Sequence, residues 1–207
     1  MNREEHIQDN IFYHVYNRGN DRDRTFGDDS DYHAFIEKMK ELETRYLVEV
    51  PVFTLMPNHY HFIALQNPGG DLPGMMGALA TSAAKRFNLK YGHIGHLFQG
   101  PYRHKFIPEE LLWHVACYIH LNPVRAGLVK DPKEWKFSNF TIFDAEVEGR
   151  LRPRLNGEEE GDLLRGLWQG YAAYVREVMR DERSQKEWEN RVLRKGYLPS
   201  EKRQRRG

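Results

Sequence analysis

Two histidines one residue apart are the first side chains in this sequence that could do chemistry. His59 and His61 stand in a run of β-forming residues, and side chains at positions i and i+2 of a strand point to the same face of a sheet. Both imidazoles would then point in one direction, which makes half of a metal site. The chain has 10 histidines in 207 residues, so a chance pair is not surprising and the pair alone is weak evidence.

Tyr118 and Asn122 form a second candidate group on a predicted helix. Four residues turn an α-helix through about 400°, so the two side chains share a face, and His114 lies one turn earlier on it. A phenol, an amide and an imidazole are an unusual choice for a core-facing stripe. The competing interpretation is that Tyr118 is a buried aromatic residue and that Asn122 caps the helix before Pro123.

Taken together, the two groups suit one reaction. A divalent cation held by two imidazoles and an amide oxygen polarises a phosphodiester, and a tyrosine oxygen attacks the phosphorus. Because free tyrosine has a pKa near ~10, the metal or basic neighbours must help it to ionise. The product is a covalent phosphotyrosine, which retains the bond energy needed for rejoining.

The elements that must position these residues follow the order strand, helix, strand, strand, helix, strand, helix. This order predicts an α+β, ferredoxin-like split βαβ fold, in which an antiparallel sheet has helices on one face, plus an added catalytic helix and a C-terminal helical extension. The alternation of the third strand places Tyr60 and Phe62 in the core, opposite the two histidines. We expect strands at 11–16, 47–56, 59–66 and 102–107, and helices after 28–31, at 72–91 and from 108 to 122–123.

The composition and the hydrophobic pattern of the sequence change after residue 143. Residues 146–161 are charged and contain Gly and Pro, as is typical of a linker, and an apolar stripe at helical spacing follows from Leu164 to Val178. We therefore assign residues 1–143 to a catalytic domain and residues 144–207 to a linker, a helical extension and a basic tail. The stripe can pack on the core, cover the site or bind a partner, and the sequence does not distinguish between these three roles.

Charge is segregated along the chain although the formal net charge is only +1. That sum argues against a strong nonspecific nucleic-acid binder, but residues 72–108 contain several Lys and Arg and no acid. A local basic face is therefore expected. Its candidate phosphate contacts, each of which also fits a solvated surface side chain, are Lys85, Arg86, Arg103 and Lys105.

Composition excludes several classes of protein. A single cysteine, Cys117, rules out an intrachain disulfide framework and an all-cysteine zinc cluster. The longest apolar runs are only a few residues, so we expect no transmembrane helix, and the first ten residues have no apolar core of a signal peptide. We expect a soluble, cytoplasmic protein.

Three motifs in this sequence are similar to those of a known family. Residues 56–63, Met-Pro-Asn-His-Tyr-His-Phe-Ile, resemble the HUH motif of single-tyrosine transposases. Residues 118–129 resemble the catalytic-tyrosine helix of that family, and residues 16–20, Tyr-Asn-Arg-Gly-Asn, resemble its N-terminal strand and loop. The resemblance spans residues 8–142 and is greatest to the REP-associated tyrosine transposases, which are similar to insertion-sequence transposases of the same class.

The resemblance implies an enzyme of DNA transposition and recombination that nicks and rejoins single-stranded DNA near hairpin repeats such as REP elements. It implies Mg²⁺ or Mn²⁺ as cofactor, with His59, His61 and Asn122 as metal ligands. Tyr118 matches the nucleophile, and its attack would leave a 5′-phosphotyrosine and a free 3′-OH. Arg18 matches the arginine of the family's loop and joins the DNA-binding candidates.

Other interpretations stay open. A catalytically idle DNA-hairpin binding protein would use the same surface without chemistry, and a phosphodiesterase would use the metal to activate water, with Tyr118 only structural. The sequence also leaves open a monomer or a homodimer, and in a dimer the tyrosine helix could serve the partner's histidines. A protein with this activity would be cytoplasmic and associated with the nucleoid.

Overall fold

The computed structural model describes residues 7–147 and 168–180. The chain divides into two compact units, Met1–Glu109 and Glu110–Gly207. The first unit carries the predicted histidine pair and the second carries the predicted tyrosine helix. The domain boundary at residue 143 stays a prediction, and most of the linker predicted at 146–161 lies outside the described residues.

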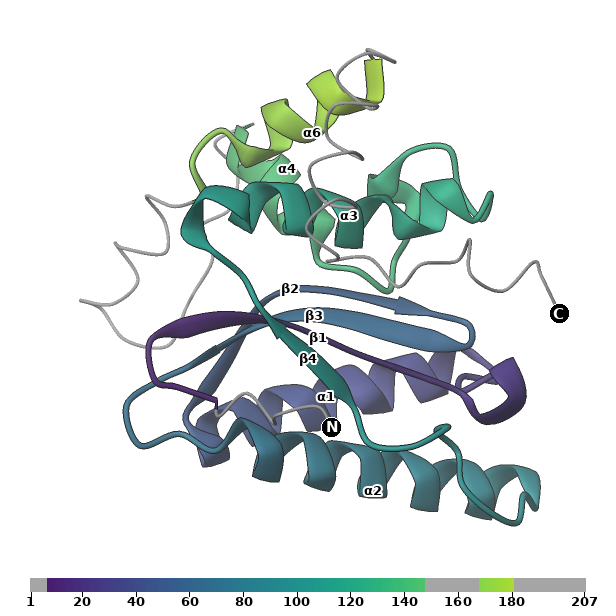
Figure 1. The fold of residues 1–207 in the computed structure, drawn as a ribbon. Coiled ribbons are helices and arrows are strands. Elements are labelled where there is room, and N and C mark those ends of the chain that lie inside the picture. Colours follow the sequence, from purple (N-terminus) through teal and green to yellow (C-terminus); the bar gives the residue numbers. More distant parts are fainter. Residues whose placement is uncertain (1–6, 148–167, 181–207) are drawn as a thin grey trace, which may run out of the picture. The chain divides into compact units, whose positions relative to one another are not determined.

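The first unit is a four-stranded antiparallel sheet with two helices (Figure 1). The strand order β2-β3-β1-β4, with one helix between β1 and β2 and another between β3 and β4, is the split βαβ arrangement. The predicted α+β fold class is therefore confirmed. The elements are β1 (Ile11–Arg18), a 3-10 turn (Asn20–Arg22), α1 (Asp29–Tyr46), β2 (Val48–Met56), β3 (His59–Gln66), α2 (Leu72–Tyr91) and β4 (Arg103–Phe106).

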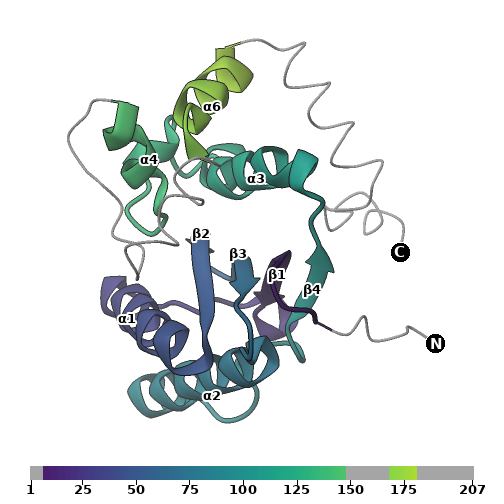
Figure 2. The ribbon, with the colours of Figure 1, turned by 90° about the vertical axis from the view of Figure 1, so that its left-hand side faces the viewer.

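Helices α1 and α2 lie on the same face of this sheet (Figure 2). The ring of Phe35 on α1 lies 5.4 Å from that of Tyr60 and 6.2 Å from that of Phe62, measured between centroids. Both β3 aromatics are almost completely buried, which stabilises each by roughly 1.5–3 kcal/mol relative to exposure. A one-residue slip of β3 would expose them and bury the histidines against the helices instead.

The start of α1 is tied to the end of α2 by a charged cluster. Asp28 caps α1 in a reciprocal capping box with Asp31, which confirms the cap predicted at 28–31. Lys90 Nζ lies 2.7 Å from Asp28 Oδ1 and 2.9 Å from Asp31 Oδ1, and Tyr91 donates to Asp31 at 2.7 Å. Burial alone would raise the pKa of Asp31, but hydrogen bonds from Lys90 and Tyr91 outweigh it and lower the pKa.

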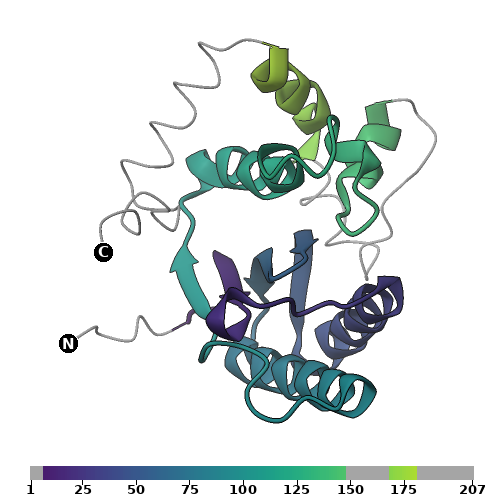
Figure 3. The ribbon, with the colours of Figure 1, turned by 90° about the vertical axis from the view of Figure 1, so that its right-hand side faces the viewer.

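The second unit is helical (Figure 3). The helix predicted to begin at residue 108 and to end at 122–123 begins later and ends later, so the prediction was wrong at both ends. Residues 109–111 form a 3-10 turn instead of the first helical turn, and the helix continues through Pro123. Its elements are that turn (Glu109–Leu111), α3 (Leu112–Arg125), a second 3-10 turn (Pro132–Glu134), α4 (Phe140–Val147) and α6 (Tyr171–Arg180).

A buried histidine joins the helices of the second unit. His120 Nδ1 lies 2.9 Å from the hydroxyl oxygen of Tyr171, and its Nε2 lies 3.1 Å from Asn139 Oδ1. Because an amide oxygen only accepts, Nε2 carries the proton and Nδ1 accepts from the tyrosine. Burial lowers the pKa of His120 to about 4, so this imidazole is neutral at physiological pH and its role is structural.

The C-terminal apolar stripe packs within this second unit as far as it is described. Tyr171 is completely buried, and its ring lies 6.0 Å from that of Trp113 on α3. Trp168 is also buried, 5.4 Å from the ring of Phe143 on α4. Packing on neighbouring helices therefore accounts for this part of the stripe. Within the described ranges, no helix is both long and apolar enough to cross a membrane.

The buried neutral state of His120 makes the second unit sensitive to acid. The folded pKa lies near 4, while that of an unfolded histidine lies near ~6.5. The free energy of unfolding therefore carries no penalty from His120 above pH ~6.5. It falls as the pH drops from there towards 4, by up to about 1.4 kcal/mol per pH unit. Urea unfolding followed by tryptophan fluorescence measures it, because all four tryptophans (113, 135, 168 and 188) belong to the second unit.

The matched comparison is between His120→Gln and His93→Gln. Gln at position 120 removes the titrating group, so we expect a flatter pH dependence, whereas the exposed His93 should leave the wild-type profile unchanged. Equal slopes in wild type and His120→Gln would contradict the assignment.

Candidate active site

Strand register places the histidine pair and three of the predicted DNA-binding residues on one face of the sheet. Across β1 and β3, Arg18 pairs with His59 and Tyr16 pairs with His61. On the other side of β1, Tyr16 pairs with Arg103 and His14 pairs with Lys105. Directly opposed residues point to the same side, and Tyr60 faces α1. The histidines, Arg18, Arg103 and Lys105 therefore share the face turned away from α1 and α2.

The two predicted metal ligands lie side by side on this face. The rings of His59 and His61 have centroids 5.1 Å apart and are nearly perpendicular, at 87°. Burial, helped by the charge of Arg18, lowers the pKa of His59 to about 4. Burial and the neighbouring His14 and His59 hold the pKa of His61 well below its usual range. Both imidazoles are therefore neutral at physiological pH, which is the form that binds a metal.

Each of these histidines has a partner at its Nδ1 atom. His59 Nδ1 lies 2.6 Å from Asn58 Oδ1, and since that oxygen only accepts, Nδ1 carries the proton and Nε2 keeps its lone pair. His61 Nδ1 lies 3.0 Å from His14 Nε2. In metal-binding histidines, the ring nitrogen that does not bind the metal characteristically hydrogen-bonds to a neighbouring group. The pair is thus held as a ligand pair would be.

Sequence reasoning missed both outer partners. Asn58 lies in the two-residue turn between the strands predicted at 47–56 and 59–66, and nothing in that turn indicates a bond to the next side chain. The alternation of β1 places His14 on the same face as Tyr16. Which residue His14 meets, however, depends on the pairing of β1 with β3, and the sequence carries no signal for that register.

Tyr118 and Asn122 lie one turn apart on α3, as predicted. Tyr118 is 8% exposed, and the guanidinium carbon of Arg125 lies 5.7 Å from the centroid of its ring. Arg125 therefore lies over the ring of Tyr118 at a distance typical of a cation–π contact. Cys117 on the same helix is buried, and burial raises the pKa of its thiol, so it is a poor nucleophile.

The Asn122 side chain is held by the helix itself. Its Nδ2 lies 2.9 Å from the carbonyl oxygen of Tyr118 and 3.5 Å from that of Ile119. The Ile119 carbonyl is the one that would accept from residue 123, and Pro123 has no N–H. The longer of the two contacts therefore gives the Ile119 carbonyl a weak donor in place of the missing backbone N–H, while the shorter one adds a bond to Tyr118.

This arrangement orients the amide group. Backbone carbonyls only accept, so the nitrogen of Asn122 must face the helix and its Oδ1 must face away from those carbonyls. An amide oxygen is a suitable ligand for Mg²⁺ or Mn²⁺. The described ranges, 7–147 and 168–180, hold no cluster of three or more His, Cys, Asp or Glu that could bind a metal. Asn122 stays the predicted third ligand, and its amide oxygen has suitable chemistry for that role.

The two remaining DNA-binding candidates lie elsewhere. Lys85 and Arg86 are on α2, which covers the opposite face of the sheet. Arg86 Nε lies 3.6 Å from Asp31 Oδ1, and its guanidinium also contacts Ser30. Lys85 is exposed. These two residues are therefore separated by the sheet from the face that carries the histidines.

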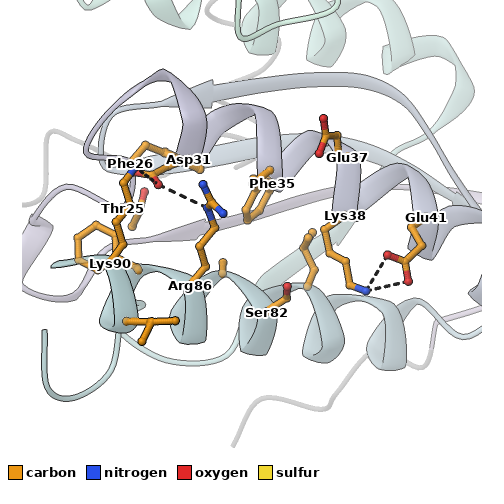
Figure 4. Close-up of a pocket in the computed structure, with 15 residues that line it drawn as sticks. Thr25, Phe26, Asp31, Phe35, Glu37, Lys38, Glu41, Ser82, Arg86 and Lys90 are labelled. Carbon is orange, nitrogen blue, oxygen red and sulfur yellow. Dashed lines mark hydrogen bonds and ion pairs between the residues drawn. The ribbon is translucent and has the colours of Figure 1, made fainter. Parts of the chain in front are cut away.

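A cavity of about 700 Å³ between α1 and α2 lies on that same far side (Figure 4). Lys38, Arg86 and Lys90 line it, and acidic side chains pair with each of them: Glu41 with Lys38, and Asp31 with the other two. Its cations are thus largely neutralised, which disfavours a phosphate site. This cavity, although large, is therefore not the candidate active site.

Comparison with known proteins identifies the family. Residues 7–122, more than half of the chain, match the family model described as transposase IS200 like. The chain belongs to the IS200-like transposase family. The predicted resemblance is therefore confirmed, and the protein is a member of a family of DNA-processing enzymes. No relative among curated proteins matches it.

Two solved structures are similar to this family member. A REP-associated tyrosine transposase bound to a REP hairpin has 21% sequence identity and a TM-score of 0.58, over 76% of this chain and 92% of that one. This likeness shows a shared fold. A protein described as a putative transposase from Deinococcus radiodurans has 18% identity and a TM-score of 0.42, over 57% of this chain and 95% of that one.

The bond between Asn122 and the carbonyls before Pro123 can be tested by a double substitution. Asn122→Ala should lower the free energy of unfolding of the second unit by about 0.5–1.5 kcal/mol, because a helix carbonyl loses its donor. In the Pro123→Ala background, residue 123 supplies a backbone N–H to the Ile119 carbonyl, so Asn122→Ala should cost less there, because only the contact with Tyr118 is then lost. Urea midpoints from tryptophan fluorescence give both values. Equal stability of Asn122→Ala and the wild type would contradict the compensation.

Proposed function

We propose that this protein is a metal-dependent endonuclease and strand transferase that nicks and rejoins single-stranded DNA near hairpin repeats. In this proposal Tyr118 is the nucleophile, and His59, His61 and Asn122 hold Mg²⁺ or Mn²⁺. The observation that carries it is the histidine pair. Two neutral imidazoles stand side by side on one sheet face, each with its Nδ1 in contact with a neighbouring side chain.

The donor set fits a divalent metal. Imidazoles suit transition metals, whereas Mg²⁺ prefers oxygen ligands, so two histidines with one amide oxygen favour Mn²⁺ where both metals are present. When bound, the metal would polarise the scissile phosphate and stabilise the charge that develops on its oxygens. The chain's own contribution is to present two deprotonated nitrogens and one oriented amide oxygen.

The proposed chemistry belongs to Tyr118. Its hydroxyl oxygen loses a proton and attacks the phosphorus, the phosphorus–O3′ bond breaks, and the departing O3′ takes up a proton to give a 3′-OH. The 5′-phosphate stays on the tyrosine as a phosphodiester. Attack by a 3′-OH on this linkage reverses the step and joins strands without an external energy source.

The charged side chains suggest a path for the DNA. Arg18, Arg103 and Lys105 share the face of the histidines, so we propose that they neutralise phosphates near the scissile bond. Lys85 and Arg86 lie on the far side of the sheet, and Arg86 would have to give up its contact with Asp31 to bind a phosphate. We propose that these two contact a part of the DNA more distant from the reaction.

A hairpin is the proposed form of the substrate. One solved relative of the same fold is described as bound to a REP hairpin, and repeats of this kind fold back as single strands. The protein would act on such DNA in the cytoplasm, where the nucleoid lies. A monomer and a homodimer are both compatible with the proposal, provided that the histidine face and the tyrosine helix meet in one chain or across two.

Replacing the nucleophile tests the central step. Tyr118→Phe should form no covalent DNA adduct and should still bind the hairpin, because it loses only a hydroxyl. The measurement is a denaturing gel of the protein mixed with a labelled single-stranded hairpin from the repeats that flank its own gene, with Mn²⁺ or with EDTA. A gel-shift assay measures binding by the same variant.

The outcomes separate the three functions. A metal-dependent covalent band in the wild type and its loss in Tyr118→Phe would support the tyrosine mechanism. A covalent band that persists in Tyr118→Phe would overturn the choice of nucleophile. Cleavage without a covalent band would indicate a phosphodiesterase that uses water, and binding without cleavage would indicate an idle hairpin-binding protein.

Removing either imidazole tests the metal site. His59→Ala and His61→Ala should each lose metal-dependent cleavage, since one imidazole cannot hold the ion in place. The control is His104→Ala on β4, where His104 pairs with Val15 and so lies on the opposite face of the sheet. It should cleave like the wild type. Unchanged cleavage in both histidine variants would remove the proposed site.

The same variants distinguish one chain from two. A mixture of Tyr118→Phe and His61→Ala proteins contains intact tyrosines and intact histidine pairs on different chains. Recovery of the covalent adduct in the mixture would place the tyrosine of one chain at the histidines of another. No recovery, with subunit exchange verified, would place both groups in a single chain.

A further inference from the structure

We propose that His14 is a positioning residue for the metal site, which fixes His61 in the tautomer that can bind the ion. The inference rests on the proposed function, because it assigns a role beside the ligands named there. It concerns a residue of β1 that makes no part of the histidine motif. Its basis is the contact between His14 Nε2 and His61 Nδ1, at 3.0 Å.

The contact is built into the sheet. His14 is completely buried and His61 is 3% exposed. Their rings are stacked, with centroids 5.2 Å apart and 21° between planes. Tyr16, opposite His61 in the β1–β3 register, flanks both rings, at 5.1 Å from His14 and 5.8 Å from His61. This packing restricts the rotation of both imidazoles.

One proton decides whether His61 can be a ligand. Two ring nitrogens 3.0 Å apart form a hydrogen bond only if one of them carries a proton. If His14 donates, the proton of neutral His61 is on Nε2, and that nitrogen has no lone pair for a metal. If His61 donates from Nδ1, its Nε2 keeps the lone pair and His14 is the acceptor.

The proposed metal site requires the second arrangement. Asn58 Oδ1 can only accept, so it fixes His59 with its proton on Nδ1. A bond from His61 Nδ1 to His14 gives both histidines the same tautomer, and both Nε2 atoms are then available. His14 itself cannot bind the same ion through Nε2, because that atom faces His61 Nδ1. It is therefore a support for the site and not a third ligand.

Nuclear magnetic resonance measures the tautomer directly, without activity. Long-range ¹H–¹⁵N spectra of the full chain, labelled with ¹⁵N-histidine and free of metal, distinguish a protonated ring nitrogen from a bare one. The His61 signals are identified by their absence in His61→Gln. We expect His61 with its proton on Nδ1 in the wild type. A proton on Nε2 would overturn the proposal.

Substitutions of His14 then test the consequence for the metal. His14→Phe keeps an aromatic ring but offers no acceptor, so Mn²⁺ affinity should fall roughly 10- to 100-fold, as is typical when an outer partner of a ligand is lost. His14→Gln can place an amide oxygen near the position of Nε2 and should recover most of the affinity. Titration of free Mn²⁺ by electron paramagnetic resonance gives the dissociation constants, and His104→Phe is the matched control.

The results separate a positioning role from a structural one. A proper fold for each variant is verified by urea unfolding and by the remaining histidine signals. Equal Mn²⁺ affinity in folded His14→Phe and wild type would overturn the role of His14 while leaving the metal site intact. No Mn²⁺ binding by the wild-type protein, with or without hairpin DNA, would instead contradict the proposed function itself. Loss of affinity in His14→Phe with recovery in His14→Gln is the result expected.

Discussion

The two-residue period of β3 is the constraint on which the candidate site depends. Burial of Tyr60 and Phe62 under α1 forces His59 and His61 to the other face. The hydrophobic core therefore decides where the imidazoles point, and no separate interaction is needed to turn them outward. The burial that holds the sheet to its helices therefore also orients the two histidines.

The face created in this way carries several histidine and arginine side chains. Besides the two histidines it carries His14, Arg18 and Arg103, all by strict pairing across three strands. Crowding of such groups explains why the histidines are neutral, since their burial and the neighbouring positive charges both disfavour protonation. The two imidazoles are therefore uncharged, and cationic side chains lie beside them.

Much of this was predictable from the sequence, for physical reasons that differ by element. The start of β3 and both ends of α2 were predicted correctly. Pro57 and Asn58 precede the strand, and Asp71 and Gly92 are residue types that favour the caps they form on the helix. The contact between His14 and His61 was not, because it depends on pairing between strands 47 residues apart. The end of α3 was also mispredicted. A proline normally stops a helix, and nothing in the sequence indicates that this one lies inside α3.

The bond from Asn122 to the carbonyls before Pro123 has a consequence for how this protein can evolve. The two positions are linked by epistasis: a change at residue 122 costs more while residue 123 lacks a backbone donor than after that donor returns. Loss of the proline first would therefore lower the cost of a later change at residue 122. The order of substitutions is thus biased by the backbone of the helix.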